Sequence, residues 1–556
     1  MAGKIKFQKP KNIGEVTDHV GNILAWAVLL IYFVGLPLFF KDGYTLIASN
    51  KYLYIMYTAE YVGIVAGIFL LLRMSLWGYS KEEIMIYKGT FRVDIFVLAF
   101  ILLSTVSHFC STFKTGGERY LTEWFYESSL WGTRGWYMGL MSYLIFAMFY
   151  FILSKLLRYS KAANIPVMLT LTVTCLWGIL NRYKIAPIDM GIEYDQSSFL
   201  ASLGNINWFC GYTSVLVPLC WGLYLGAKKL WLKITLTVVN LITFYMIFVN
   251  ASDSGIFAMF ISFAVLFCFT VTQKERFKTF TELVITMLIP ASLIGLIDVI
   301  MPKQRTGTFG MLEFFFGIGA FAVLTAVVIF YVLFFYRLKE YPVKVMGTVR
   351  KIFIIFIVSV FLGYVLIVIF NTIMGGIIPR VGKNRFFFFS NRWASSRGAT
   401  WKIGLMTFAD MDFGHKLIGS GPDTFYYEMI KHPAAKEISD KVFKGARLTN
   451  AHNEWITLLV NNGLLGLTAF VGMLYSGVRA SFKYAEENVE IIGFALAIIS
   501  YTANNMFSFE QLTNTPFLFL VMGLEGAAIA SIVRKSASLT KSGRNTKIQR
   551  SKNKKK

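Results

Sequence analysis

Residues 351–373 read KIFIIFIVSVFLGYVLIVIFNTI, and no charged residue follows Lys351 within this stretch. About 20 consecutive apolar residues form a helix long enough to cross the roughly 30 Å hydrocarbon core of a bilayer. The rest of the chain has a similar character, since 56% of its 556 residues are hydrophobic and only 15% are charged. Ordinary soluble domains do not have this composition. The sequence therefore predicts an integral membrane protein.

Apolar runs of similar length on both sides of this stretch predict about fourteen transmembrane helices in an all-α, polytopic fold. The polar N-terminus shows no small-residue cleavage site before the first run, so we expect that run to be kept as a membrane helix. The approximate ranges are 22–40, 53–72, 93–111, 136–155, 166–181, 206–226, 232–250, 254–272, 280–299, 312–336, 351–373, 455–478, 489–506 and 515–533.

The net charge of +24 is spread over short Lys and Arg clusters between the apolar runs, a pattern that does not favour a nucleic-acid-binding patch. Clusters precede the first run and then follow every second run. Because Lys and Arg accumulate in cytoplasmic loops, both termini are predicted to be cytoplasmic. The basic tail is poor in apolar residues, which predicts disorder. The predicted regions are a cytoplasmic N-terminus 1–20, transmembrane helices 1–11 within 21–373, a large extracytoplasmic loop 374–453, transmembrane helices 12–14 within 454–533 and a cytoplasmic tail 534–556.

Several classes of chemistry lack their sequence signatures. The five cysteines lie in or beside apolar runs without CxxC spacing, which argues against disulfides and structural zinc. No GxxxxGK[ST], HExxH or GxSxG motif is present. We therefore expect an enzyme without metal or other cofactor, whose driving energy comes with the substrate.

The predicted loop 374–453 is unusually basic for an extracytoplasmic segment. Long loops can escape the charge bias, so the basic residues need not have a function. The other interpretation is an outward-facing anion site, because the guanidinium fork of arginine matches phosphate oxygens. A helix is predicted over 395–412, capped by Ser395 or Ser396, with Trp401, Leu405, Phe408 and Met411 forming one apolar stripe. The basic residues are Arg380, Lys383, Arg385, Arg392, Arg397, Lys402, Lys416 and Arg447.

The stretch AHNEWITLLVNNGLLGL, residues 451–467, places a histidine at the start of an apolar run. If Asn450 caps a helix, His452 lies in the first turn, where the helix dipole disfavours imidazolium. Gly463 and Gly466 then share a helix face with His452, which predicts close helix packing below it. A histidine that merely caps or hydrogen-bonds at an interface is the alternative interpretation.

Four elements together resemble the bacterial O-antigen ligase and O-antigen polymerase superfamily. His452 and Asn453 are followed by nine residues, 454–462, and then by Gly463-Leu-Leu-Gly466, which matches the ligase motif. Arg397-x-x-x-Trp401, the GSGPDTF sequence ending at Phe425, and Asn205-x-Asn207 in GNINWFCGY also resemble family elements. These elements extend over about residues 200–470 in the expected order.

The resemblance implies a cell-surface polysaccharide enzyme of the bacterial cytoplasmic membrane with an extracytoplasmic active site. Such enzymes transfer a glycan from undecaprenyl pyrophosphate to an acceptor sugar on a glycan or glycolipid, as ligases or as polymerases, without metal. By the same resemblance, His452 would be the general base that deprotonates or orients the acceptor hydroxyl, Arg397 would bind the pyrophosphate, and Asn453 would position the histidine or a sugar hydroxyl; Asn207 belongs to the matching Asn-x-Asn element and is a candidate substrate-orienting residue.

One position departs from the family pattern. Where ligases carry Arg-x-x-x-Leu near an outer tip, this chain reads ASDSGIFA, with Asp253 in the corresponding place. This leaves Arg392, Arg380 and Arg182 as alternative pyrophosphate ligands, and Asp253 as a ligand for sugar hydroxyls or a solvated helix cap.

A flippase for lipid-linked oligosaccharides is the alternative function. Transporters tend to show paired repeats with charged groups at mid-membrane. This sequence shows no convincing repeat, and its ionisable residues are expected to gather in the long loop. That distribution favours the enzyme.

Overall fold

The computed structural model describes residues 13–76, 86–114, 125–191, 199–300, 316–337, 339–379, 382–384 and 386–553. These residues are almost entirely helical, which confirms the predicted all-α polytopic class. The single described sheet is a short antiparallel pair in which Phe199 lies opposite Asn205 and Leu200 opposite Gly204.

The described helices and strands follow one another along the chain with short connections. The elements of the first half are α1 (Ile13–Leu30), α2 (Leu36–Leu38), α3 (Ile47–Thr58), α4 (Ile64–Leu76), α6 (Phe91–Cys110), α7 (Leu140–Leu156), α8 (Asn164–Arg182), β1 (Phe199–Leu200), β2 (Gly204–Asn205), α9 (Ile206–Gly226), α10 (Leu230–Asn250) and α11 (Asp253–Thr270). Those of the second half are α12 (Lys274–Ile300), α13 (Ile318–Val332), α14 (Val343–Ile373), α15 (Trp393–Asp410), α16 (Phe413–Ile418), α17 (Phe425–Met429), α18 (Pro433–Phe443), α19 (Glu454–Ala485), α20 (Ile492–Asn504) and α21 (Thr515–Asn553).

Twelve helical segments of the described residues are long and apolar enough to cross a membrane. Some combine several elements; Val16–Leu38, for instance, joins α1 and α2 through a π-helical turn at Ile31–Gly35. Two shorter apolar helices, Leu140–Leu156 and Val489–Asn504, coincide with two further ranges that the sequence assigned to the membrane. The count of fourteen crossings stays a prediction, since length and composition alone define these segments.

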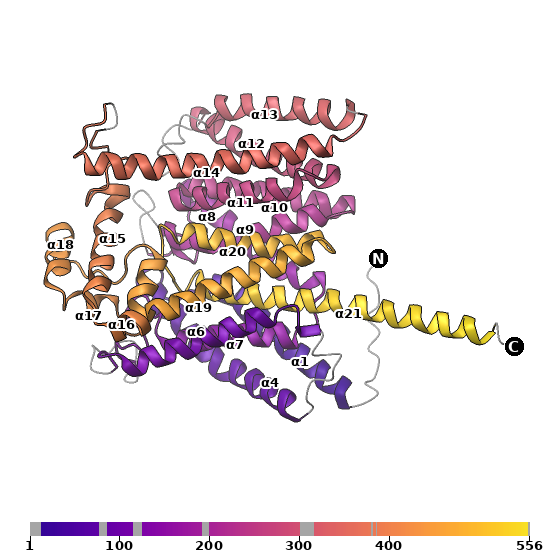
Figure 1. Cartoon of the computed structure of the whole chain (residues 1–556), viewed down its shortest axis with the longest axis horizontal. Helices are drawn as coiled ribbons and strands as arrows, with labels where there is room; N and C mark the ends of the chain where they lie inside the picture. Colours follow the sequence, from indigo (N-terminus) through magenta and orange to yellow (C-terminus); the bar gives the residue numbers. More distant parts are fainter. Residues whose placement is uncertain are drawn as a thin grey trace.

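The long helices run side by side, and α15 to α18 gather at one end of them, here called the loop end (Figure 1). α21 extends from the opposite end (Figure 1). It runs to Asn553, so the tail is a helical continuation there rather than the disordered segment that its composition predicts.

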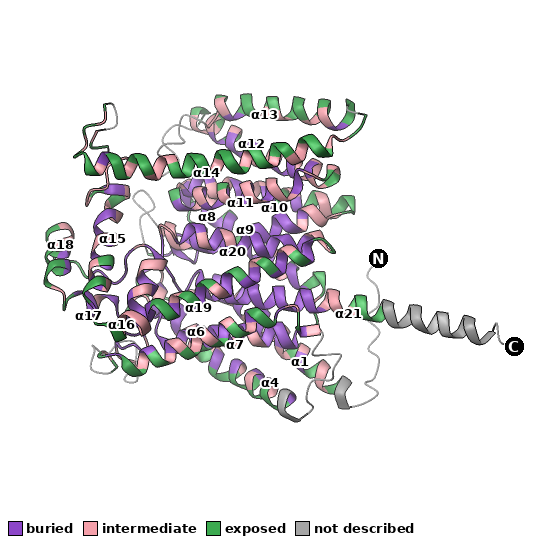
Figure 2. Ribbon diagram, in the orientation of Figure 1, coloured by how far each residue is buried: buried purple, intermediate pink, exposed green. Residues whose placement is uncertain are grey.

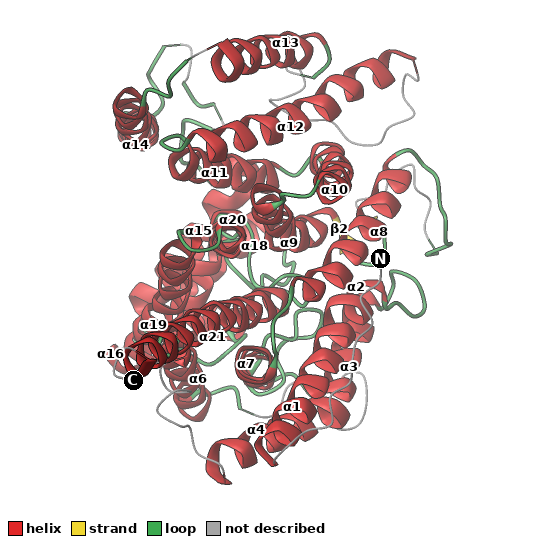
Figure 3. Cartoon of the chain, turned by 90° about the vertical axis from the view of Figure 1, so that its right-hand side faces the viewer, coloured by secondary structure: helices red, strands yellow, loops and turns green. Residues whose placement is uncertain are grey.

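The core of the bundle is formed by helices from both halves of the chain. α9 packs on α20, α21 on α7 and α19 on α6. In both α9 and α21, 83% of the most apolar window is buried, whereas in α14 none of it is (Figure 2). α12, α13 and α14 lie on one flank and α1, α3 and α4 on the other (Figure 3). The helices that meet in the centre are therefore the ones that position the loop end.

Ionisable side chains are not confined to the long loop. Glu525 of α21 is buried and accepts a hydrogen bond from Ser481 Oγ at 2.6 Å. Lys155 pairs with Asp94 at 2.6 Å, and Lys51 is buried in α3. The predicted gathering of ionisable residues in one external loop is thus wrong, because buried hydroxyl, carbonyl and carboxylate partners satisfy these groups inside the bundle.

Candidate functional site

His452 lies just before α19 rather than in its first turn. Its φ is +47°, in the left-handed region, and Asn453 is the residue that caps α19, by accepting a hydrogen bond from Ile456 N at 3.0 Å. Asn450 instead accepts a hydrogen bond from His452 N at 3.0 Å. The predicted helix start and the wheel position of His452 are therefore wrong. This turn directs the imidazole against the ring of Phe509, with centroids 5.2 Å apart.

The imidazole of His452 is neutral at neutral pH. Burial lowers its pKa, and the positive charge of Arg397 lowers it further, to about 4. The helix dipole, which the sequence suggested as the cause, is not needed. A neutral imidazole has one nitrogen that can accept a proton or a hydrogen bond.

Arg397 faces the site from α15. A left-handed turn at Ala394, Ser395 and Ser396 precedes it, so the right-handed part of the helix starts later than a cap at Ser395 or Ser396 predicts. The buried side of this helix includes Ala399, Ile403 and Thr407, while Leu405 of the predicted stripe is 48% exposed.

The guanidinium of Arg397 has no carboxylate partner among the described residues. Its Nε donates to the Phe507 carbonyl at 2.8 Å and its Nη1 to the Ala394 carbonyl at 3.2 Å. Burial lowers the pKa of Arg397, and the negative charge of Asp253 opposes this effect. Arginine nevertheless keeps its charge in proteins. A half-buried cation with unused N–H donors is suited to an anionic ligand.

Residues 505–514, between α20 and α21, form a buried loop that the sequence analysis missed. The Phe507 carbonyl receives Arg397, and the Met506 carbonyl receives Asn453 Nδ2 at 3.0 Å. The Phe509 ring contacts His452, and Glu510 accepts a hydrogen bond from Tyr143 at 2.6 Å. The stretch NNMFSFEQLTNT at 504–515 interrupts two apolar runs with many amide and hydroxyl side chains, and this signal could have identified the loop.

Glu454 joins this loop to the histidine segment. Its backbone N donates to the Asn505 carbonyl at 3.0 Å, and its buried carboxylate accepts hydrogen bonds from Tyr501 Oη at 2.7 Å and from Asn505 Nδ2. Asn453 uses both of its side-chain groups for α19 and for Met506. In this structure Asn453 therefore holds the backbone around His452.

The GSGPDTF segment packs against α19 where that helix is kinked. Ser420 N and Gly421 N donate to the Val460 and Asn461 carbonyls at 3.0 and 2.9 Å. Gly463 has φ +68°, and a Cβ there would lie 2.4 Å from Leu417 O. The predicted packing seam between transmembrane helices is wrong at Gly463, because this glycine admits the backbone of the neighbouring loop instead.

Asp423 of the same segment is buried and fixes residues 125–139. Its Oδ2 accepts hydrogen bonds from Thr133 N at 2.6 Å and Met138 N at 3.1 Å. Burial raises the pKa of Asp423 to about 7, although these hydrogen bonds act in the opposite direction. The segment thus connects α19 to the loop before α7.

The remaining predicted residues lie at the same end of the bundle. Asn205 caps α9, as the Asn-x-Asn element predicted, and Asn207 Oδ1 accepts a hydrogen bond from Ser252 Oγ at 3.3 Å. Asp253 is exposed at the start of α11 and acts on Arg397 through its charge. The structure therefore brings Asn207, Asp253 and Arg397 into one region.

Most other arginines named by the sequence analysis are not comparable with Arg397. Arg182 donates to the Val249 and Asn250 carbonyls at the end of α10, at 2.8 and 2.5 Å. Arg447 forms a two-pronged ion pair with Glu127, at 3.0 and 2.8 Å. Arg392 is exposed at the start of α15, and Arg380 lies outside the described residues.

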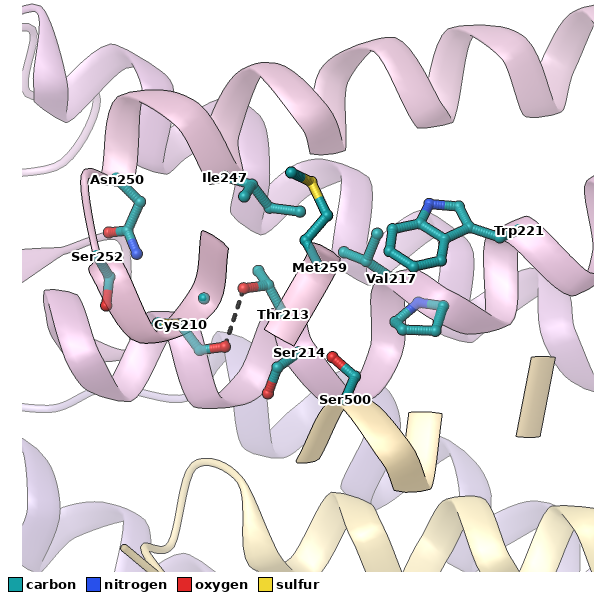
Figure 4. A pocket seen from close by; sticks show the side chains of 12 residues that line it. Cys210, Thr213, Ser214, Val217, Trp221, Ile247, Asn250, Ser252, Met259 and Ser500 are labelled. Carbon is teal, nitrogen blue, oxygen red and sulfur yellow. Dashed lines mark hydrogen bonds between the residues drawn. The ribbon is translucent and has the colours of Figure 1, made fainter. Parts of the chain in front are cut away.

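A cavity between α9, α10, α11 and α20 adjoins this region. Asn250 and Ser252 lie at one end of it and Trp221 at the other, with Ile247 and Met259 between them (Figure 4). Its polar end is next to Asn207, which bonds Ser252. The cavity therefore passes from the polar site into an apolar interior.

Fold and site together define a polytopic all-α membrane protein with a histidine and an arginine at one end of its helices. Residues 317–471 match the family model described as O-antigen ligase, which confirms the resemblance to the O-antigen ligase and polymerase superfamily. No curated protein matches the chain. The matched segment contains Arg397 and His452 but not Asn207, Asp253 or residues 505–514. This family supports a role in membrane glycan assembly and a glycosyltransferase-like activity.

Proposed function

We propose that this protein transfers a glycan from undecaprenyl pyrophosphate to a sugar hydroxyl of an acceptor, as a ligase or a polymerase. The observation that carries the proposal is the neutral, half-buried imidazole of His452 beside Arg397, whose charge has no ion-pair partner among the described side chains. Both residues lie in the segment that matches O-antigen ligase. The reaction needs a proton acceptor and a cation for a leaving diphosphate, and these two groups supply them.

In the proposed reaction an acceptor oxygen forms a bond to the anomeric carbon of the donor while the bond from that carbon to the pyrophosphate oxygen breaks. The hydroxyl proton passes to the neutral nitrogen of His452. The negative charge that develops on the pyrophosphate is stabilised by Arg397, with exposed Arg392 nearby in sequence as a second ligand. Arg380 remains a third candidate from the sequence. A single displacement of this kind inverts the anomeric configuration and requires no metal.

Donor binding should also make His452 a better base. Arg397 lowers the pKa of His452 in the structure. A pyrophosphate beside Arg397 compensates that positive charge, so imidazolium becomes less unfavourable when the donor is bound. A base whose pKa approaches the working pH is more effective. The two residues would therefore act in sequence, with the donor first.

The remaining polar groups of the region have roles as ligands or as supports. Asp253 and Asn207 are proposed to contact sugar hydroxyls, and Asn453 to hold the turn that orients His452. We place the protein in the bacterial cytoplasmic membrane with both termini cytoplasmic and the loop end extracytoplasmic. The position of the loop end opposite the end of α21 supports this orientation (Figure 1).

The test is a transfer assay on protein purified in lipid nanodiscs, with lipid-linked donor and acceptor glycolipid extracted from the native membranes. We expect His452→Ala to lower the rate roughly 100- to 10,000-fold, as expected for loss of a general base. Arg397→Ala should lower it on the order of 100- to 1,000-fold, as for loss of a charge-stabilising donor. Product length distinguishes repeated polymerisation from a single ligation.

Matched controls are His415→Ala and Arg479→Ala. His415 bonds Asp412 on α16, and Arg479 is exposed on α19 outside the loop end. Both variants should transfer glycan like the unmodified protein. Normal transfer by correctly inserted His452→Ala protein would refute the general-base role, and donor flipping without transfer would favour a transporter.

A further inference from the structure

A second cavity lies at the loop end, on the other side of Phe509 from His452. It is lined by residues of four separate segments, namely α3, the loop 125–139, the start of α9 and the loop 505–514. The Trp136 ring contacts Phe509 edge to face at 4.8 Å, and Phe509 in turn contacts His452 at 5.2 Å. The cavity therefore adjoins the proposed base through one aromatic ring. Its lining residues are Ala48, Lys51, Gly135, Trp136, Trp208, Gln511, Leu512 and Thr513.

Two buried polar atoms of this cavity have no hydrogen-bond partner among the described residues. They are Gln511 Oε1 and Thr513 Oγ1, and each of these residues is 3% exposed. The amide nitrogen of Gln511 donates to Ser508 Oγ at 3.4 Å, so the oxygen is the group that remains. Buried polar atoms are nearly always paired, which points to a ligand with hydroxyl groups.

The walls of the cavity are aromatic. Trp136 and Trp208 meet edge to face with ring centroids 5.9 Å apart. Gly135 provides space beside them, because a Cβ placed there would meet no heavy atom within 4 Å. Indole faces bear partial negative charge and attract the weakly positive C–H groups of a ring lying against them.

The single charged residue that lines the cavity is not available to bind an ion. Lys51 Nζ donates to the carbonyls of Leu36, Pro37 and Phe39 at 2.7, 3.3 and 2.9 Å, which uses its three N–H groups. A hydrocarbon ligand would leave Gln511 and Thr513 unpaired. A neutral sugar satisfies both kinds of surface, with C–H groups on the indoles and hydroxyls on the polar atoms.

From this geometry we propose that the cavity is a subsite for a neutral sugar unit of the acceptor, next to the unit that His452 activates. This inference rests on the proposed transferase function. The acceptor is favoured over the donor because Arg397, the proposed pyrophosphate ligand, bonds the Phe507 carbonyl beside Trp401 and Trp393, whereas the cavity lies on the Phe509 side. The two substrates thus approach His452 from different sides of the loop 505–514.

The experiment uses Thr513→Val and Gln511→Leu, which remove a polar atom with little change of volume. Initial transfer rates are measured against acceptor and donor concentration separately, in nanodiscs. We expect each variant to raise the KM for acceptor about tenfold, with the KM for donor unchanged; a tenfold change corresponds to about 1.4 kcal/mol. Thr468→Val, on the exposed surface of α19, is the matched control and should leave both constants unchanged.

A binding measurement gives a readout that is independent of turnover. Saturation-transfer NMR with methyl glucoside, methyl galactoside and N-acetylglucosamine should show contact of at least one sugar with the unmodified protein and with His452→Ala. The signal should weaken in Thr513→Val. An inactive His452→Ala protein combined with unchanged acceptor KM in both cavity variants would overturn the subsite alone. Active His452→Ala protein would overturn the proposed function instead, and a raised KM for donor would overturn the assignment to the acceptor.

Discussion

At the scale of single residues, the chemistry depends on the influence of Arg397 on His452. Burial is the larger cause of the lowered pKa of His452, and the charge of Arg397 is the second. The same arginine is held by two backbone carbonyls, so its position does not depend on a counter-ion. Any change that removes or compensates the guanidinium charge should therefore act on the imidazole.

We predict that Arg397→Gln raises the pKa of His452 above about 4 without restoring its ordinary value of 6.5, because burial remains. The measurement is an NMR titration of protein labelled at its five histidines, with His452→Ala used to assign the signal. Arg479→Ala is the control and should leave the titration unchanged. A midpoint that does not move in Arg397→Gln would show that the charge of Arg397 does not reach the imidazole.

At the scale of secondary-structure elements, α19 is shaped by one glycine. Gly463 has φ +68° and ψ −177°, a backbone conformation that essentially only glycine adopts. The kink lets the α16 segment approach, and the hydrogen bonds from Ser420 and Gly421 to the carbonyls of Val460 and Asn461 follow from it. The spacing of Gly463 from His452 thus reflects how the loop before α17 docks on the helix.

Gly463→Ala should destabilise the protein by at least about 1–3 kcal/mol from backbone strain alone. A Cβ only 2.4 Å from Leu417 O and Gly419 N adds a steric clash. We expect a lower thermal unfolding midpoint in detergent and a loss of transfer activity. Gly363→Ala is the matched control, since a Cβ at this helical position of α14 meets nothing within 4 Å. Equal midpoints for the two variants would contradict the role given to the kink.

At the scale of the whole molecule, the site is assembled by helices that are distant in sequence. α15 and the start of α19 supply Arg397 and His452, while residues 505–514 join them and α9 and α11 add Asn207 and Asp253. All of these segments meet at the loop end, opposite the end of α21 (Figure 1). Membrane orientation can therefore be read from any accessible residue at either end.

Cys110 gives such a reading, because it is exposed at the last position of α6 and its neighbour Ser111 contacts Gly421 of the loop end. In intact spheroplasts a membrane-impermeant maleimide should label the protein, and Cys110→Ser should abolish the labelling. A cysteine introduced as Lys535→Cys in the Cys110→Ser protein should react only after permeabilisation. The opposite pattern would place the loop end in the cytoplasm and contradict the proposed orientation.

The apolar runs, the family motifs and the cap of α9 at Asn205 could be predicted from the sequence, since each depends on residues close together in the chain. The helical-wheel argument for His452 failed, because Asn453 rather than Asn450 caps α19. The arginine-rich loop was only partly informative. Arg447 and Glu127 are separated by 320 positions, and nothing local in the sequence indicates that one would neutralise the other.

By itself, the sequence determined that this chain is a polytopic membrane protein and that its histidine motif resembles that of O-antigen ligases. Both conclusions follow from local properties, namely the apolar length that a bilayer requires and the spacing of a few residues. Only the tertiary structure decided which arginine keeps an unpaired charge, how His452 becomes neutral, and that residues 505–514 hold the two together. These properties depend on burial and on hydrogen bonds between segments far apart in the chain, which no local pattern specifies.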